Sequence, residues 1–237
     1  IYEVVLCSGY GGFSEGAQAA GAATKFGANH WAPAISTFRL NHPTAQVFAQ
    51  DLSEADWQSF PAADMLIAGP SCQGFTRARG RERKGHDKLR NTMWAVPNAL
   101  EALRPELLIV ENVPEVQEWA LYDAWISTLG LLGYSHETHV LDAADFGVPQ
   151  HRVRWFCVAT RSNTPLAIGR LLQQSMRPRR AAAECIDWQF PRWSPVAKPG
   201  RSPKALRQIA RGRREIGPRF LMPYYGAGSG LTGRSLD

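Results

Sequence analysis

Near its start the chain reads Val4-Val5-Leu6-Cys7-Ser8-Gly9-Tyr10-Gly11-Gly12-Phe13. The apolar run predicts a strand and the stretch that follows predicts a helix, so the glycines occupy the turn between them. Gly9 and Gly11 can adopt dihedrals closed to other residues and let backbone amides approach a ligand at the helix N-terminus. Turns of this kind bind several nucleotide cofactors, and some merely reverse the chain. The stretch therefore predicts an α/β fold and leaves the ligand open.

Outward from this turn, short apolar runs alternate with helix-like stretches, the pattern of a mostly parallel sheet flanked by helices. We predict strands at Glu3–Leu6, Lys25–Ala28, Gln46–Gln50, Asp64–Ala68, Leu107–Val110, His136–Leu141 and Val153–Ala159. We predict helices at Phe13–Ala22, Ala32–Asn41, Thr92–Ala102 and Tyr122–Leu132. After Arg161 the periodicity fades and Pro, Arg and Gly become frequent. These patterns predict a Rossmann-like domain over residues 1–161, followed by a basic linker and a partial second region over residues 162–237.

The composition fits one sizeable core, because 44% of the 237 residues are hydrophobic. No apolar stretch is long enough to span a bilayer, and the first residues lack a signal-peptide pattern, so we expect a cytoplasmic protein. Its cysteines, Cys7, Cys72, Cys157 and Cys185, form no CxxC pair and fit neither a disulfide framework nor a zinc site. We therefore predict reduced thiols and no metal.

Charge divides unevenly along the chain. Residues 1–160 carry 12 basic and 17 acidic side chains, whereas residues 161–237 carry 15 and 4, within a net charge of +6. A basic segment favours a polyanionic partner, because Lys and Arg release condensed counterions from phosphates. A solvated tail has the same composition, so charge alone leaves both interpretations open.

Two chemically reactive side chains follow buried strands. Cys72 comes shortly after the apolar run that ends at Ala68, and Glu111 directly follows the run that ends at Val110. If one helical crossover joins these strands, they are parallel, and both side chains lie at the same carboxyl edge of the sheet. Open α/β sheets bind ligands at that edge, beside the glycine turn. Two such residues at matched strand ends favour an active site over two structural residues.

Other strands also lead to polar or aromatic side chains. The second strand ends at Asn29, His30 and Trp31, where ribose hydroxyls and a purine ring could be bound, although a tryptophan can equally fill the core. Asp51 follows the third strand. Its carboxylate could accept a hydrogen bond from an adenine amino group or cap the helix that begins at Leu52.

The last strand begins within Gln150-His151-Arg152-Val153-Arg154. Residues two apart point to one face of a strand, so Arg152 and Arg154 present guanidinium donors that suit phosphate or a pyrimidine carbonyl. Surface strands also carry such pairs for solubility alone. Between Pro70 and Asn91 a long segment lacks apolar periodicity. Loops of that length are usually functional, which makes it a candidate lid.

Taken in order, these motifs resemble those of the cytosine-5 DNA methyltransferases. The matching segments are the glycine turn, Pro70-Ser71-Cys72-Gln73, Glu111-Asn112-Val113 and Gln150-His151-Arg152-Val153-Arg154. The stretch Phe220-Leu221-Met222-Pro223-Tyr224-Tyr225-Gly226 resembles the entry to the family's target-recognition region. The resemblance implies the S-adenosylmethionine-dependent methyltransferase fold. The family's C-terminal helix, which completes the cofactor pocket, and most of its recognition domain do not appear in these residues.

The resemblance also implies a reaction, the transfer of a methyl group from S-adenosylmethionine to carbon 5 of a flipped-out cytosine in DNA. Cys72 would attack carbon 6, Glu111 would bind nitrogen 3 and the amino group, and Arg154 would bind the carbonyl oxygen with support from Arg152. The implied cofactor site comprises Cys7, Ser8, Gly9, Tyr10, Gly11, Gly12, Phe13, Asn29, His30, Trp31, Asp51, Leu52 and Pro70.

DNA is the partner that the resemblance implies, with basic side chains on its backbone. The residues assigned to DNA are Gln73, Arg77, Arg79, Arg81, Arg83, Lys84, Arg90, Arg211, Arg213 and Arg214. We further expect a monomer of bacterial or phage origin that can be paired with a restriction endonuclease. Three alternatives stay open: the same reaction on transfer RNA, a catalytically silent nucleic-acid-binding protein on this scaffold, and a dinucleotide oxidoreductase. The last would leave Cys72 and Glu111 unexplained.

Three residues depart from the family's motifs. Cys7 replaces the usual phenylalanine beside the adenine, Asn29 the usual ribose-binding glutamate, and Ser71 the proline that precedes the nucleophile. The first two would reshape the cofactor site. The third would loosen the backbone that aims Cys72, because proline fixes φ and serine does not.

Overall fold

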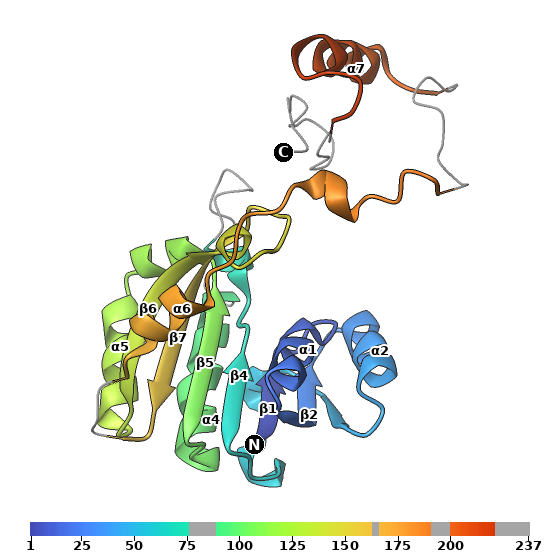
Figure 1. Ribbon diagram of the computed structural model, residues 1–237. Helices are drawn as coiled ribbons and strands as arrows, with labels where there is room; N and C mark the ends of the chain where they lie inside the picture. Colours follow the sequence, from blue (N-terminus) through green and yellow to red (C-terminus); the bar gives the residue numbers. More distant parts are fainter. Residues whose placement is uncertain (76–88, 163–165, 191–199, 221–237) are drawn as a thin grey trace. The chain divides into compact units, whose positions relative to one another are not determined.

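The computed structural model describes residues 1–75, 89–162, 166–190 and 200–220. Within these residues the strands form one sheet in the order β3-β2-β1-β4-β5-β7-β6 (Figure 1). The strands are β1 (Tyr2–Leu6), β2 (Ala23–Asn29), β3 (Gln46–Ala49), β4 (Met65–Ala68), β5 (Leu107–Asn112), β6 (Ser135–Asp142) and β7 (Val153–Thr160). Strands β1 to β5 run parallel to one another, whereas β7 is antiparallel to both β5 and β6.

The strand register brings the ends of β1, β4 and β5 to one edge of the sheet. Leu6 pairs with Ala68, and Ala68 pairs with Val110. Because parallel strands end at the same edge, the segments that follow these three residues emerge beside one another. The predicted adjacency of the strands that lead to Cys72 and Glu111 is thereby confirmed.

The helices are α1 (Gly12–Ala19), α2 (Ala32–Asn41), α4 (Ala95–Leu103), α5 (Tyr122–Leu131), α6 (Ile168–Ser175) and α7 (Pro203–Glu215). Short 3-10 helices lie between them: η1 (Leu52–Glu54), η2 (Trp57–Ser59), η3 (Cys72–Gly74), η5 (Asn91–Trp94), η6 (Pro114–Glu118), η7 (Ala143–Asp145) and η8 (Ala182–Cys185). The nucleophile candidate thus begins a 3-10 helix at the sheet edge.

Strand β4 is buried on both faces. Leu66 belongs to the same core as Leu100 of α4 and Trp125 of α5. Its neighbour Ile67 belongs to a second core with Ala17 of α1. Successive side chains of a strand point to opposite faces, so one strand serves both cores. A strand buried on both faces reads as a continuous apolar run, which explains why β4 was predictable.

All the strands and helices predicted from the sequence are present, with ends shifted by a few residues. Beyond Arg161, where the sequence periodicity fades, the structure contains two helices that were not predicted, α6 and α7. Helix α7 carries a start signal that we overlooked: Ser202 caps it by accepting the Ala205 N–H, and Pro203 occupies its first turn.

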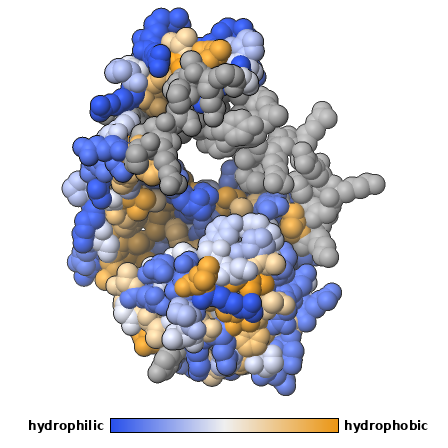
Figure 2. Space-filling view, turned by 90° about the vertical axis from the view of Figure 1, so that its right-hand side faces the viewer, coloured by the Kyte–Doolittle hydropathy of each residue, from blue (hydrophilic) through white to orange (hydrophobic). Residues whose placement is uncertain are grey.

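The chain forms two compact units. One comprises residues 1–142 and 152–175, and the other comprises residues 143–151 and 176–237. The first unit therefore extends beyond residue 161 to the end of α6, and the functional division at that residue stays a prediction. Hydrophilic residues cover much of the face shown in Figure 2, with hydrophobic side chains exposed among them. No helix in the described ranges is long and apolar enough to cross a membrane.

Candidate active site

The segment after β4, Gly69–Phe75, is the nucleophile turn, and Cys72 is the first residue of its 3-10 helix η3. The Cys72 side chain is half-buried. One anchor of the turn comes from β5, where the buried Asn112 amide donates from Nδ2 to the Pro70 carbonyl over 3.3 Å. The Asn112 Oδ1 accepts the Val113 N–H at 2.8 Å. Strand β5 thus holds the turn from within the sheet.

Two further anchors of the nucleophile turn come from the residues just before α4. The Ser71 N–H donates to Thr92 Oγ1 at 3.0 Å, and the Thr92 hydroxyl donates to the Leu89 carbonyl at 2.7 Å. Arg90 Nε donates to the Gly74 carbonyl at 3.0 Å. The turn is therefore tied to side chains that lie much later in the sequence.

The four cysteines differ in their surroundings. Burial raises the pKa of the Cys7 thiol to about 12, with a further contribution from the nearby Asp51 carboxylate. Burial likewise raises the pKa of Cys157 to about 12. Both stay neutral thiols at neutral pH and are poor nucleophiles. Cys185 is exposed and belongs to the second unit. Cys7 and Cys72 are both partly exposed at the carboxyl edge of the sheet, and the raised pKa of Cys7 leaves Cys72 as the candidate nucleophile.

Glu111 lies near the end of β5 and faces arginines of β7. The antiparallel register pairs Glu111 with Phe156, and Arg154, two residues from Phe156, lies on the same face. Arg154 Nε is 3.0 Å from Glu111 Oε1, and Arg152 Nη2 is 3.7 Å from the same oxygen. The structure therefore brings both predicted arginines to the predicted glutamate.

The pKa of the Glu111 carboxyl is subject to opposing effects. Burial raises its pKa above the ordinary value of 4.5, although the charges of Arg154 and Arg152 and a hydrogen bond from Arg154 act in the opposite direction. A carboxyl with a raised pKa holds its proton more readily and can donate a hydrogen bond. The site thus combines a thiol with a partly buried carboxyl that two guanidinium groups contact.

The glycine turn, Cys7–Gly12, leaves β1 at the same edge of the sheet. Gly9 and Gly11 adopt φ of +52° and +97°, in the left-handed region that favours glycine. A Cβ on Gly9 would meet no atom within 4 Å, so the space above it is open. A Cβ on Gly11 would lie only 2.6 Å from His42 Nε2. Here the glycine is required by close packing as well as by its dihedrals.

The end of α2 holds the glycine turn in place. Asn41 Nδ2 donates to the Tyr10 carbonyl at 2.9 Å, and His42 Nε2 lies 3.3 Å from the Gly11 carbonyl. On the other side of the imidazole, Gln18 Nε2 lies 3.2 Å from His42 Nδ1. An amide nitrogen can only donate, so Nδ1 accepts, and Nε2 carries the proton that is donated to Gly11.

A cavity of about 400 Å³ reaches from the glycine turn to the nucleophile turn. Its walls are Cys7, Asn29, His30, Trp31, Asp51, Leu52, Ser53, Gly69, Ser71, Gln73 and Thr92. Of the predicted cofactor residues, Cys7, Asn29, His30, Trp31, Asp51 and Leu52 line this cavity. Among the others, Ser8 and Pro70 are buried beneath the edge, and Gly9, Gly12 and Phe13 continue from the glycine turn into α1.

The side chains of two predicted cofactor residues in the cavity wall, Asn29 and Asp51, accept hydrogen bonds within the chain. Asn29 Oδ1 accepts the Trp31 N–H at 2.9 Å. Asp51 Oδ1 accepts both the N–H and the hydroxyl of Ser53, at 3.0 Å and 2.8 Å. Asp51 therefore caps η1, one of the two roles that the sequence left open, and it also lines the cavity.

Trp31 of the cavity wall lies near a second aromatic side chain, Tyr10. Tyr10 and Trp31 are 52% and 51% exposed, and their ring centroids lie 5.7 Å apart. An amide and a carboxylate that can meet ribose hydroxyls, together with a ring that can lie against a purine, suit a nucleoside cofactor. The open space above Gly9 is consistent with a ligand that approaches the backbone closely.

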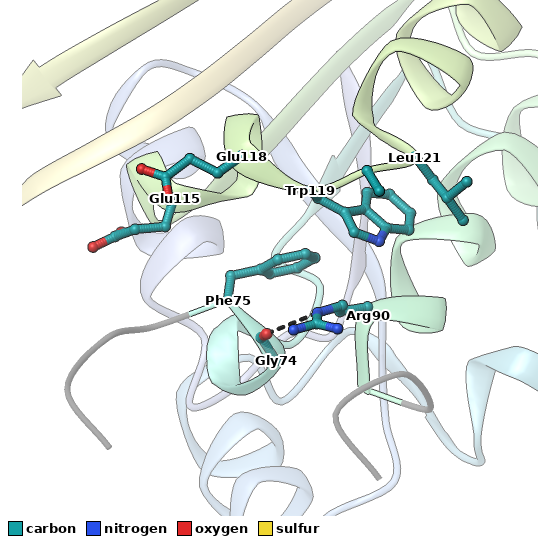
Figure 3. Close-up of a pocket in the computed structure, with 8 residues that line it drawn as sticks. Gly74, Phe75, Arg90, Glu115, Glu118, Trp119 and Leu121 are labelled. Atoms are coloured by element: carbon teal, nitrogen blue, oxygen red, sulfur yellow. Dashed lines mark hydrogen bonds between the residues drawn. The ribbon is translucent and has the colours of Figure 1, made fainter. Parts of the chain in front are cut away.

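A second cavity, of about 440 Å³, adjoins the nucleophile turn (Figure 3). It is lined by Gly74, Phe75, Arg90, Glu115, Glu118, Trp119, Ala120 and Leu121. Figure 3 shows the Arg90 guanidinium beside Phe75, with its hydrogen bond to the Gly74 carbonyl. The Phe75 and Trp119 rings meet edge to face, with centroids 5.7 Å apart. The contact of Arg90 with DNA stays a prediction.

The other residues assigned to DNA are placed as follows. Gln73 is exposed at the nucleophile turn. Arg213 is exposed on α7, and Arg211 and Arg214 lie 2.8 Å and 3.5 Å from carboxylate oxygens of Glu215. The residues Arg77, Arg79, Arg81, Arg83 and Lys84 lie outside the described residues. The contacts of this set with DNA stay predictions.

Sequence reasoning missed three side chains that shape the site, Asn112, Thr92 and His42. Asn112 had a signal, since an amide beside Glu111 at the end of an apolar strand must be buried and must find partners. Thr92 and His42 had none, because each acts on a turn that is distant in the sequence.

Comparison with known proteins identifies related sequences. The family model described as C-5 cytosine-specific DNA methylase matches residues 3–188. Type II methyltransferase M.HgiDI of Herpetosiphon aurantiacus is 32% identical over 180 residues, which is 72% of this chain. The human tRNA (cytosine(38)-C(5))-methyltransferase is 26% identical over 163 residues, or 64% of this chain.

Among solved structures, the S. pombe Dnmt2 methyltransferase superposes with a TM-score of 0.66 and 21% sequence identity over 79% of this chain, which shows a shared fold. The chain spans 56% and 41% of the lengths of the two relatives and 60% of the S. pombe protein.

Proposed function

Because this chain belongs to the family of C-5 cytosine-specific DNA methylases, we propose that it transfers a methyl group to carbon 5 of cytosine in DNA through a covalent bond to Cys72. The observation that supports the proposal is the set of reactive side chains gathered at the carboxyl edge of the sheet. There the half-buried Cys72 thiol follows β4, and the Glu111 carboxyl with its two arginines lies near the end of the adjacent β5. The cavity that the nucleophile turn shares with the glycine turn lies at the same edge.

S-adenosylmethionine is the cofactor that this family membership implies, and when bound it supplies the methyl group. The cavity residues suit its nucleoside part. Asn29 and Asp51 would hold the ribose and the adenine amino group, and Trp31 would lie against the purine. The backbone amides after Gly9 would face the remaining part of the cofactor.

The chain's own residues would activate the base. Carbon 5 of cytosine is a weak nucleophile, so the Cys72 thiolate first adds to carbon 6 and makes the ring electron-rich. Negative charge then develops towards nitrogen 3, where Glu111 would hydrogen-bond the ring, and Arg154 would stabilise the carbonyl oxygen. After methylation, loss of the carbon 5 proton restores the double bond and expels the thiolate. Both faces of the ring are used, so the base must leave the helix stack.

Transfer RNA is the second candidate substrate, because one relative acts on it according to its name. The full-length protein should be incubated with tritiated S-adenosylmethionine and either DNA or transfer RNA. Label in DNA, lost in Cys72→Ser, is the expected result. Label in transfer RNA alone would assign the same chemistry to RNA. Label in neither would favour a silent nucleic-acid-binding protein. The monomeric state, the cellular location and the pairing with a restriction endonuclease stay predictions.

A further inference from the structure

Ser71 has the backbone shape of a proline without being one. Its φ is −55° and its ψ is 118°, and a proline ring restricts φ to about −65 ± 15°. Serine has no ring to hold that value, so something else must restrict the residue that precedes Cys72. Unlike proline, serine keeps a backbone N–H, and this group must find a partner when it leaves water.

Thr92 is that partner. Its Oγ1 accepts the Ser71 N–H at 3.0 Å and donates to the Leu89 carbonyl at 2.7 Å. The second hydrogen bond fixes the direction of the hydroxyl, so the oxygen presents a lone pair to Ser71. Thr92 lies in η5, which continues directly into α4, and Val96 and Leu100 of α4 belong to the main core. The acceptor is therefore held by a rigid part of the molecule.

We propose that Thr92 is a positioning residue for Cys72, and that its hydrogen bond to the Ser71 amide restricts the nucleophile turn as a proline ring would. The Ser71 hydroxyl contributes little, since it accepts the Gln73 N–H at 3.4 Å, a long contact. Asn112 and Arg90 donate hydrogen bonds to the carbonyls of Pro70 and Gly74. The hydrogen bond of the Ser71 N–H is to Thr92.

The geometry makes the hydrogen bond and a proline mutually exclusive. A proline at position 71 would place its ring carbon about 1.5 Å from the nitrogen, where the N–H now points. With the nitrogen 3.0 Å from Thr92 Oγ1, that carbon would overlap the hydroxyl. Ser71→Pro should therefore disturb the turn while Thr92 is present. With alanine at position 92 the ring has room, and there is no longer an N–H to satisfy.

The proposal rests on the proposed function for its meaning, but its test uses a readout that does not require methylation. In the full-length protein, the rate at which iodoacetamide alkylates Cys72 is measured by peptide mass spectrometry, relative to the exposed Cys185 in the same sample. Ser71→Pro and Thr92→Ala should each raise this ratio severalfold, because a released turn exposes a half-buried thiol. The double variant Ser71→Pro with Thr92→Ala should return it towards the wild-type value.

Two conservative variants separate this account from general destabilisation. Thr92→Ser keeps the hydroxyl and should leave the ratio at the wild-type value. Ser71→Ala keeps the N–H, so the effect of Thr92→Ala should persist in its background. The proposal is overturned if Thr92→Ala leaves the ratio unchanged, or if the double variant is no closer to wild type than the single variants.

Methyl transfer to DNA, measured with the same variants, should fall about tenfold in each single variant and recover in the double variant. If no variant and no wild-type protein methylates DNA while the alkylation pattern holds, the proposed function fails and the positioning role stands. If the wild type methylates and the alkylation pattern is absent, the positioning role fails alone.

Discussion

The glycine turn and the nucleophile turn leave neighbouring strands at one edge of the sheet, yet they are held in different ways. The glycine turn has Gly9 and Gly11 in left-handed conformations, and hydrogen bonds from Asn41 and His42 of the α2 end add to this backbone constraint. The nucleophile turn, Gly69–Phe75, contains no described residue with positive φ. It is held by Asn112, Thr92 and Arg90, side chains that come from other elements.

The difference between the two turns decides whether the residues that fix a turn can be recognised from the turn's own sequence. A turn that depends on glycine dihedrals can be recognised from its own residues. A turn that depends on distant hydrogen bonds can be recognised only by its chemical residue, here Cys72, and its support remains hidden until the fold is known. Changes in the two turns should therefore have different effects.

The largest effect is expected from Gly11→Ala. The added Cβ would lie 2.6 Å from His42 Nε2 at a φ of +97°, so left-handed strain and overlap should together lower the free energy of unfolding by about 2–4 kcal/mol. Chemical denaturation of the full-length protein measures this loss. The matched control is Gly16→Ala in α1, where a Cβ meets no atom within 4 Å. It should be neutral or slightly stabilising, and an equal loss in both variants would contradict this view of the glycine turn.

An intermediate effect is expected from Asn112→Ala. The variant leaves the Pro70 carbonyl and the Val113 N–H without their partner, which should cost about 1–3 kcal/mol of unfolding free energy. The variant should also slow methylation, because the nucleophile turn loses an anchor. Gln117→Ala on the exposed side of η6 is the control. A variant that is destabilised but methylates at the wild-type rate would show that Asn112 supports the fold and not the turn.

The smallest effect concerns pH and Glu111. Burial raises the pKa of Glu111 above 4.5, so the folded protein binds this proton more tightly than the unfolded chain. The resulting stabilisation is complete below the ordinary pKa and is lost as pH rises through the raised value. Glu111→Gln lacks this titration. The melting temperature of the wild type minus that of Glu111→Gln should therefore fall as pH rises above 4.5. A difference that stays constant or grows would refute the raised pKa of Glu111 in the folded protein.

Much of the fold was readable from the sequence because the central strands β4 and β5 have no exposed residue on either face. The apolar runs of β4 and β5 stand out against their surroundings, and the positions of Cys72 and Glu111 follow from where those runs end. Helix α7 was missed because its arginines obscure the apolar side chains Leu206 and Ile209, although its capping residues were visible.

The support of the site could not be read in the same way. His42 meets the Gly11 carbonyl only because α2 packs beside α1, and Thr92 meets Ser71 only because η5 packs beside η3. Such contacts depend on packing and leave no local pattern. Ser71 was interpreted as a loosening of the nucleophile turn, whereas the structure shows that its N–H gives the turn an additional anchor.

The proposed function requires a covalent bond between Cys72 and the target base. The most direct measurement is the formation of a denaturation-resistant complex between the full-length protein and DNA that contains 5-fluorocytosine, in the presence of S-adenosylmethionine. Fluorine at carbon 5 blocks the last elimination, so the adduct should accumulate in the wild type and in Cys185→Ser and should be absent in Cys72→Ser. A complex that persists in Cys72→Ser, or its absence from the wild type, would contradict the account.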